Sequence, residues 1–398
     1  MGRVLKVLVA PGSYKGSLDS KEVAANISIG LRKASKKYTV RELPLADGGS
    51  GTVAVLTAAY KGEYVTGRVT GPSGNAINAA YGWVPQKHLA VIELAQAAGL
   101  ALTPPQERNP CVTTTRGVGE LIADALQRGA RDIILGVGDS ATIDCGIGAL
   151  SVLGIRFFDR EDNEIDHNCR GLIDLMTIDD SACLSDISTA RITIAADVMN
   201  TLTGKQGAIV YARQKGATPS MMSDINRALE NFKRVIENQY GIDVDAISGA
   251  GAAGGVPAAF RAILNADVQP GFKLVAEAVN LQKYVQDSDV IITGEGRVDH
   301  QSFSGKVVGN VVAIAREYKK PVILVAGSTT RGVRAFVNRG FFACYSLKKS
   351  GRSLADTMEN AARLLVETAH TIGKNLLRSN LNPDEIYQSH EGTHSTFT

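Results

Sequence analysis

The chain begins with two strand-like apolar segments, each followed directly by a glycine-rich polar loop. The segment 4–10 leads into a loop that carries Lys15, and the segment 38–45 leads into a loop that carries Asp47. In sheets of parallel strands, ligands bind beyond the carboxyl ends of the strands. A lysine on one such loop and a carboxylate on the next suit an anionic substrate together with a metal ion or a proton. The opening of the chain therefore indicates an α/β fold that carries out phosphoryl chemistry.

Alternating strand-like and helix-like segments continue along most of the chain. We expect further strands at 64–69, 76–84, 89–94, 131–137, 155–158, 191–196, 289–293, 321–326 and 342–346. We expect helices at 20–37, 51–61, 119–128, 141–153, 220–240, 256–264, 306–319 and 354–377. Ser20 is the residue that we expect to cap the first helix.

The arrangement of these segments predicts two α/β domains. Residues 1–62 and 286–378 share short buried strands with polar loops, and we expect them to form one Rossmann-like parallel sheet from both chain ends. We expect residues 63–285 to form a mixed α/β domain inserted between them. We expect the polar segment 379–398 to be a flexible tail.

Composition excludes several classes of protein. The net charge is +3, from 43 basic and 40 acidic residues, which is too balanced for a nucleic-acid binder. No apolar run approaches the roughly 20 residues that a membrane helix needs, and there is no signal peptide pattern. The chain has 5 cysteines and no C-x-x-C pair, so we expect neither a disulfide framework nor a zinc site. A cytoplasmic protein fits these features.

Two glycine-rich motifs resemble nucleotide-binding patterns without matching them fully. Residues 249–254 fit G-x-G-x-x-G, but the preceding segment 242–247 is a poor strand, so a nicotinamide site is weakly supported. An anion site and close helix packing both remain open for this motif. The segment 304–307 departs from the P-loop pattern at two positions, but Lys306 lies at a helix start, where free amides favour an anion.

Carboxylates at strand ends are the remaining candidates. The buried strand 289–293 is followed by a cluster of charged residues, Glu295, Arg297 and Asp299. This cluster is either a binding site or a salt-bridged turn at the surface. Asp197 ends the strand 191–196, where it can act as a base, bind a metal ion or cap a turn.

Taken in order, these motifs resemble those of the bacterial type-1 glycerate kinases over about residues 5–375. The matching segments are 10–15, 46–52, 69–72, 249–255 and 294–299. The resemblance implies phosphorylation of D-glycerate with ATP and Mg²⁺, with 2-phosphoglycerate as the usual product. It also implies two α/β domains with the site in the cleft between them. The expected ligands are a small hydroxy acid and a nucleotide, with no nucleic acid and no membrane as partner, and a homodimer is left open.

We assign roles to residues at the matching positions from their chemistry. The catalytic candidates are Asp197, as the base, and the cations Lys15, Lys306 and Arg297. The substrate-binding candidates are Ser13, Asp47, Gly48, Gly49, Lys215 and Gly251. The candidate ligands of Mg²⁺ are Asp47, Glu295 and Asp299, because hard cations prefer oxygen.

Several motif positions depart from the family pattern. The departures are Gly12, where Asp is usual, Asp139, Ile143 and Cys145 within the segment 138–146, and Arg213. If these loops line the site, the substrate could differ from D-glycerate. The alternatives are therefore a diverged enzyme for another hydroxylated metabolite, and a non-catalytic binding protein on the same fold.

Overall fold

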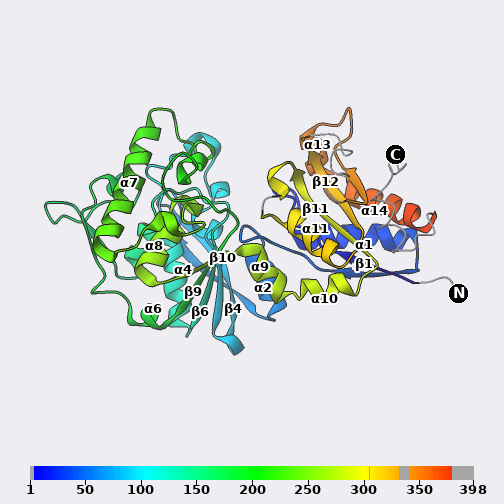
Figure 1. Cartoon of the computed structure of the whole chain (residues 1–398), viewed down its shortest axis with the longest axis horizontal. Coiled ribbons are helices and arrows are strands. Elements are labelled where there is room, and N and C mark those ends of the chain that lie inside the picture. Colours follow the sequence, from blue (N-terminus) through cyan, green and yellow to red (C-terminus); the bar gives the residue numbers. More distant parts are fainter. Residues whose placement is uncertain (1–3, 304, 331–340, 379–398) are drawn as a thin grey trace. The chain divides into compact units, whose positions relative to one another are not determined.

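The computed structural model describes residues 4–303, 305–330 and 341–378 (Figure 1). The chain folds into two compact units, one from Met1–Asp47 and Val275–Thr398 and the other from Gly48–Leu274. Each unit has its own sheet with helices packed on it, which confirms the predicted α/β class. The segment 379–398, predicted to be a tail, lies outside the described residues. None of the helices in the described part of the chain is long and apolar enough to cross a membrane.

The unit formed by the two chain ends contains a five-stranded parallel sheet with the strand order β13-β12-β11-β1-β2. Its strands are β1 (Leu5–Val9), β2 (Tyr38–Glu42), β11 (Val290–Val298), β12 (Val322–Thr329) and β13 (Ala343–Ser346). Its helices are α1 (Ser20–Ala34), α10 (Leu281–Gln286), α11 (Val307–Glu317), α13 (Leu354–Glu359) and α14 (Ala361–Arg378). A Rossmann-like sheet built from both ends of the chain is therefore confirmed.

Helices α1 and α14 pack against each other on one face of this sheet (Figure 1). The sheet residues under them are apolar and buried: Val7, Val9, Val290, Ile292, Ile323 and Val325. Helix α11 packs against β11 and β12. Because parallel strands with helices on them are buried, they appear in the sequence as continuous apolar runs rather than as alternating patterns.

The residue that caps α1 is Asp19, not Ser20 as predicted. The Asp19 Oδ1 accepts a hydrogen bond from the Glu22 backbone N–H at 2.7 Å, and the Asp19 N–H donates to Glu22 Oε2 at 2.9 Å. This reciprocal pair satisfies two groups that a helix start would otherwise leave unpaired. Ser20 is buried within the first turn.

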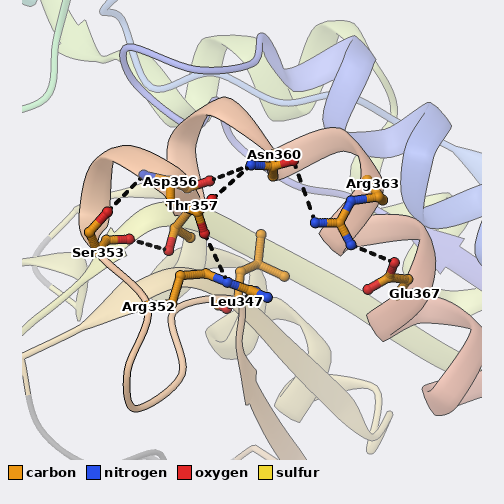
Figure 2. Close-up of polar contacts among 8 residues, drawn as sticks. All are labelled: Leu347, Arg352, Ser353, Asp356, Thr357, Asn360, Arg363 and Glu367. Carbon is orange, nitrogen blue, oxygen red and sulfur yellow. Dashed lines mark hydrogen bonds and ion pairs between the residues drawn. The ribbon is translucent and has the colours of Figure 1, made fainter.

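The predicted helix 354–377 is two helices in the structure. Asn360 separates α13 from α14, with φ −95° and ψ 11°. Its side-chain amide donates to the Asp356 carbonyl oxygen at 3.1 Å, and Figure 2 shows Asn360 between the two helical segments. Because the break is a local change of backbone angles at one residue, the spacing of apolar residues along the helical pattern did not reveal it.

The middle unit contains a six-stranded mixed sheet with the strand order β10-β9-β6-β5-β4-β3. Its strands are β3 (Glu63–Thr70), β4 (Ala76–Val84), β5 (Leu89–Glu93), β6 (Asp132–Gly136), β9 (Arg191–Ala196) and β10 (Asp267–Pro270), and β7 (Arg156–Phe158) pairs with β8 (Thr177–Asp179) separately. The strands β3, β4 and β5 are antiparallel, and β5, β6, β9 and β10 are parallel.

The helices of the middle unit bury apolar side chains, many of them in one large core. They are α2 (Thr52–Ala59), α3 (Ala95–Ala98), α4 (Arg116–Gln127), α5 (Ile147–Val152), α6 (Ser185–Thr189), α7 (Met221–Tyr240) and α8 (Val256–Leu264), and α9 (Gly271–Ala278) contains the point where the chain leaves the unit. The predicted helix 141–153 begins only at Ile147. Positive φ angles at Asp139, Cys145 and Gly146 are incompatible with a helix before that residue.

The units divide the chain at points different from those predicted. We expected boundaries after residues 62 and 285, whereas contacts divide the chain after Asp47 and after Leu274. Helix α2 packs against β4 and β5, so the segment 48–62 is grouped with the middle unit. In the sequence, this segment looks like a helix that follows β2 in the same sheet. Only its packing shows that α2 covers the sheet of the middle unit.

Candidate functional site

In the unit formed by the two chain ends, which we call the end-built unit, the polar loops meet at the edge of the sheet where its parallel strands end. The Gly12 N–H donates to the Gly294 carbonyl at 2.9 Å, and the Leu45 N–H donates to the Pro11 carbonyl at 2.9 Å. These bonds align the segments that follow β1 and β2 with β11. The candidates on these neighbouring segments are Ser13, Lys15, Asp47 and Glu295.

Glu295 is an acid at this edge whose pKa is raised. It lies within β11, because the strand continues to Val298 instead of ending at residue 293 as predicted. Burial raises the pKa of Glu295 to about 7, the Ser302 hydroxyl and Lys306 oppose the rise, and the charges of Asp47 and Asp299 add to it. Its Oε1 is buried and, within the described part of the chain, makes no hydrogen bond. A carboxylate of this kind can hold a cation or exchange a proton near neutral pH.

Tyr14 is part of this edge and was missed in the sequence. Its ring is buried, and its hydroxyl donates to the Val325 carbonyl at 2.8 Å. A Cβ added at Gly296 would lie 3.0 Å from the Tyr14 Cα, and one added at Gly294 would lie 3.0 Å from the Tyr14 hydroxyl. The two glycines of the Glu295 motif therefore allow the loop after β1 to rest directly on β11.

The candidate cations lie at exposed or half-buried positions. Lys15 is exposed, and Lys306 is the N-cap residue of α11. Arg297 is 71% exposed, and its Nε lies 3.8 Å from Asp299 Oδ2. A loose, solvated ion pair of this kind adds little to stability. These cations can therefore meet an anionic ligand at small cost to the fold.

The three predicted magnesium ligands do not form a complete set by themselves. Across residues 4–303, 305–330 and 341–378, no group of three or more His, Cys, Asp or Glu side chains lies close enough to hold a metal ion. Mg²⁺ commonly takes one or two carboxylates and completes its shell with water and substrate phosphate. The buried oxygen of Glu295 fits such a partial set, with Asp47 and Asp299 within electrostatic reach.

The middle unit holds the other candidates, beginning with Gly48 and Gly49. The Gly138 N–H donates to the Gly48 carbonyl at 3.1 Å, and a Cβ at Gly48 would lie 2.6 Å from the Ala195 carbonyl oxygen. The Gly49 carbonyl accepts from Thr52 Oγ1 at 2.7 Å. This turn therefore packs directly on the carboxyl ends of β6 and β9.

Asp197 follows β9 and is half-buried, and its role as a base stays a prediction. Burial raises the pKa of the Tyr211 hydroxyl, and the nearby Asp197 charge adds to the shift. The Tyr211 hydroxyl donates to Asn200 Oδ1 at 2.6 Å. Asp197, Asn200 and Tyr211 thus form one polar group beyond the end of the strand.

Lys215 is buried, with only 3% of its surface exposed. Its ammonium donates to Ser140 Oγ at 2.7 Å and to the Thr142 carbonyl at 2.8 Å. Burial lowers the pKa of Lys215 to about 7, and the negative charge of Asp144 opposes this shift. Lys215 therefore fixes the segment 138–146 from the side of the core.

Lys215 should make stability depend on pH. Its pKa is about 7 in the folded protein and about 10.5 in the unfolded chain, so unfolding takes up a proton between these values. Stability should therefore rise with pH in this window. From pH 7 to pH 9 the native protein should gain about 2 kcal/mol relative to Lys215→Met. Urea unfolding of both proteins at the two pH values measures the difference, and equal pH slopes would contradict it.

Asp144 holds the same segment and was not among the predicted residues. It is fully buried, and its Oδ2 accepts from the Thr115 N–H and the Thr115 hydroxyl, each at 2.7 Å. Its Oδ1 accepts from the Gly146 N–H at 3.0 Å. Burial raises its pKa, and these hydrogen bonds oppose the rise. The sequence shows that Asp144 belongs to the segment 138–146, but it does not show that the side chain is buried.

Comparison with known proteins shows which family this chain resembles. The family model described as the glycerate kinase family matches residues 7–377. A glycerate kinase from Halalkalibacterium halodurans is 40% identical over 92% of this chain and 97% of its own length. A glycerate 2-kinase from Escherichia coli K12 is 39% identical over 94% of this chain and 98% of its own length.

The chain belongs to the glycerate kinase family. A crystal structure from Salmonella typhimurium LT2, assigned as a glycerate kinase 2, has the same fold. Its TM-score is 0.80 at 40% identity, and the match covers 95% of this chain and 99% of that one. The resemblance inferred from the ordered motifs is thereby confirmed.

Close packing accounts for the glycine-rich motif 249–254 of this member of the glycerate kinase family. A Cβ at Gly251 would lie 2.0 Å from the Thr201 carbonyl oxygen, and the Gly251 N–H donates to the Asn200 carbonyl at 2.9 Å. The segment before it contains the short 3-10 helix Val244–Ala246 and no strand. These contacts favour packing over an anion site, and the substrate-binding role of Gly251 stays a prediction.

Two of the departures from the family pattern lie in the core. Ile143 and Cys145 are fully buried in the apolar core of the middle unit. At Gly12, a Cβ would lie 3.4 Å from Val307 Cγ2, an ordinary contact distance, so sterics do not require glycine there. The side chains of Ile143 and Cys145 can therefore affect a ligand only through the shape of their loop, which weakens the argument for an altered substrate.

Proposed function

We propose that this protein transfers the terminal phosphoryl group of ATP to a hydroxyl group of D-glycerate and forms 2-phosphoglycerate. The observation that carries the proposal is the carboxyl edge of the end-built sheet. It joins exposed and half-buried cations to the half-buried Glu295, whose buried Oε1 lacks a hydrogen bond within the described residues. Membership of the glycerate kinase family supports this reaction, and we assign it to this edge.

The chain's own residues would act by positioning and by neutralising charge, as phosphoryl transfer requires. Lys15, Arg297 and Lys306 would bind and orient the negative oxygens of the phosphates. Asp197 would accept the proton of the attacking hydroxyl. Residues Glu295 and Asp299, with Asp47, would hold Mg²⁺, which supplies further neutralisation of phosphate charge when it is bound.

The five cysteines, all of them free thiols, suit a reducing cytoplasm.

Coupled release of ADP tests this function. The protein with ATP, Mg²⁺ and D-glycerate should release ADP at a rate well above that with glycerate omitted. Ranking kcat/KM over D-glycerate, larger sugar acids and other hydroxy acids separates the alternatives. A better acceptor than D-glycerate would indicate a diverged enzyme. Ligand binding without release of ADP across the panel would indicate a binding protein and refute the proposal.

A further inference from the structure

Two cysteine thiols in the middle unit lie against each other in the apolar core. Cys111 is 4% exposed and Cys169 is 1% exposed, and both belong to the large core of this unit. Neither thiol has a part in the proposed kinase reaction. A pair of buried thiols in contact can undergo a chemistry that a lone buried cysteine cannot, because each sulfur has a partner with which to form a bond.

The two cysteines come from segments that lie side by side. The Arg170 N–H donates to the Cys111 carbonyl oxygen at 3.2 Å, so the residue next to Cys169 is bonded to the backbone of Cys111. The thiols of Cys111 and Cys169 are themselves in hydrogen-bond contact. Neighbouring backbones with side chains that face each other are what a disulfide requires.

The surroundings of the two thiols make them chemically different. The hydrogen bond from Cys169 lowers the pKa of Cys111, burial opposes this shift, the Arg170 charge adds to it, and Asp224 opposes it. The same contact with Cys111, followed by burial, raises the pKa of Cys169. Because the thiolate is the reactive form of cysteine, Cys111 is the nucleophile of the pair and Cys169 holds its proton.

Cys111 lies in a turn next to the surface. The Cys111 N–H donates to Asn109 Oδ1 at 3.1 Å, within the turn 109–113 that precedes α4. Val112 in this turn is 41% exposed, and Arg170 is exposed beside it. A local opening of the turn would expose the Cys111 sulfur to a small uncharged oxidant.

We propose that Cys111 and Cys169 form a redox modification site, at which hydrogen peroxide converts the two thiols to a disulfide and a dithiol reductant restores them. The Cys111 sulfur attacks one oxygen of peroxide, the O–O bond breaks, and hydroxide leaves as the sulfenic acid forms. The Cys169 sulfur then attacks the Cys111 sulfur, and the S–O bond breaks. The proton of Cys169 leaves with that oxygen, so one peroxide and two thiols give one disulfide and two waters.

This site does not depend on the proposed kinase function. A transient disulfide is compatible with a compartment that keeps thiols reduced at rest. Its formation stops the oxidation of Cys111 at a stage that a reductant can reverse, before the sulfinic acid. The bond would also tie the turn 109–113 to the segment around Cys169. The Thr113 hydroxyl of this turn donates to the Ala141 carbonyl at 3.1 Å, so the turn in turn holds the loop 138–146.

Peptide mapping by mass spectrometry of the full chain tests the site. The reduced protein is treated with hydrogen peroxide, alkylated and digested without reductant. We expect a linked pair of peptides that contain Cys111 and Cys169, and a loss of two of the five thiols that dithiothreitol reverses. Cys183 of the same unit is half-buried, and burial raises its pKa. The Cys111 thiol should be lost at least about tenfold faster than that of Cys183, although Cys183 is the more exposed.

Variants separate the two roles. In Cys169→Ser no disulfide can form, and Cys111 should be recovered as sulfenic and sulfinic acid. Cys169→Ala is tested beside it, because alanine suits a buried apolar place, and circular dichroism shows that each variant is folded. Cys183→Ser is the control and should form the disulfide as the native protein does. A native protein that keeps all five thiols, oxidises Cys183 first, or links Cys169 to Cys145 instead of Cys111 would overturn the inference.

Discussion

Lys306→Ala is expected to lower kcat/KM for ATP-dependent phosphorylation by roughly 30- to 1,000-fold, which corresponds to about 2–4 kcal/mol of lost transition-state stabilisation. Lys306 stands at the start of α11, within electrostatic reach of the half-buried Glu295. There it can neutralise charge that develops on the transferred group. Steady-state kinetics with D-glycerate and ATP measure the loss, and Lys15→Ala should lose activity on a similar scale.

The fold should tolerate these changes, because Lys15 is exposed and Lys306 is only half-buried, and lysines that stay in contact with water contribute little to stability. Thermal unfolding of both variants should therefore resemble that of the native protein. Lys33→Ala is a matched control, because Lys33 is an exposed lysine of the same unit, in the last turn of α1. Turnover close to the native value in both Lys306→Ala and Lys15→Ala would mean that phosphate binds elsewhere.

Asp144→Ala is expected to destabilise the middle unit by about 3–5 kcal/mol. The change leaves the Thr115 N–H, the Thr115 hydroxyl and the Gly146 N–H without their acceptor in a fully buried place. It also loosens the link to α5, because the Thr115 hydroxyl accepts from the Ala149 N–H at 3.0 Å. Denaturant unfolding gives the change in free energy.

Asp166→Ala serves as the comparison for this result. Asp166 is an exposed aspartate of the same unit, so its loss should change the free energy of unfolding by no more than about 0.5 kcal/mol. If Asp144→Ala unfolds at the same denaturant concentration as the native protein, the hydrogen bonds of Asp144 do not stabilise this unit.

The strands that carry the candidate site could be predicted from the sequence. Residues 4–10, 191–196 and 289–293 are apolar runs, and each contains or largely overlaps a strand of the structure. Sheets buried under helices require such runs. Since polar residues soon after these runs must lie near the sheet edge, Lys15 and Asp197 could be named as candidates with no knowledge of packing.

Other features had no local signal. Strand β10 contains Asp267, Gln269 and Pro270, and it is recognisable only because it pairs with β9 at the edge of the sheet. An edge strand tolerates polar residues and proline, because one of its sides makes no ladder bonds. The division of the chain after Asp47 is of the same kind, since it depends on which sheet α2 covers.

The sequence by itself determined the α/β class, the parallel sheet built from both chain ends and the candidate acids and lysines at strand ends. These follow from local apolar runs and from the rule that loops after parallel strands share one edge. Only the tertiary structure decided which polar groups are buried and what they face. In the structure, Asp144 and Lys215 hold one loop through hydrogen bonds, and Asp139 accepts a hydrogen bond from the Ser50 hydroxyl. The physical reason is that burial and hydrogen bonding depend on segments far apart in the chain, and the sequence of one segment does not show which other segments pack against it.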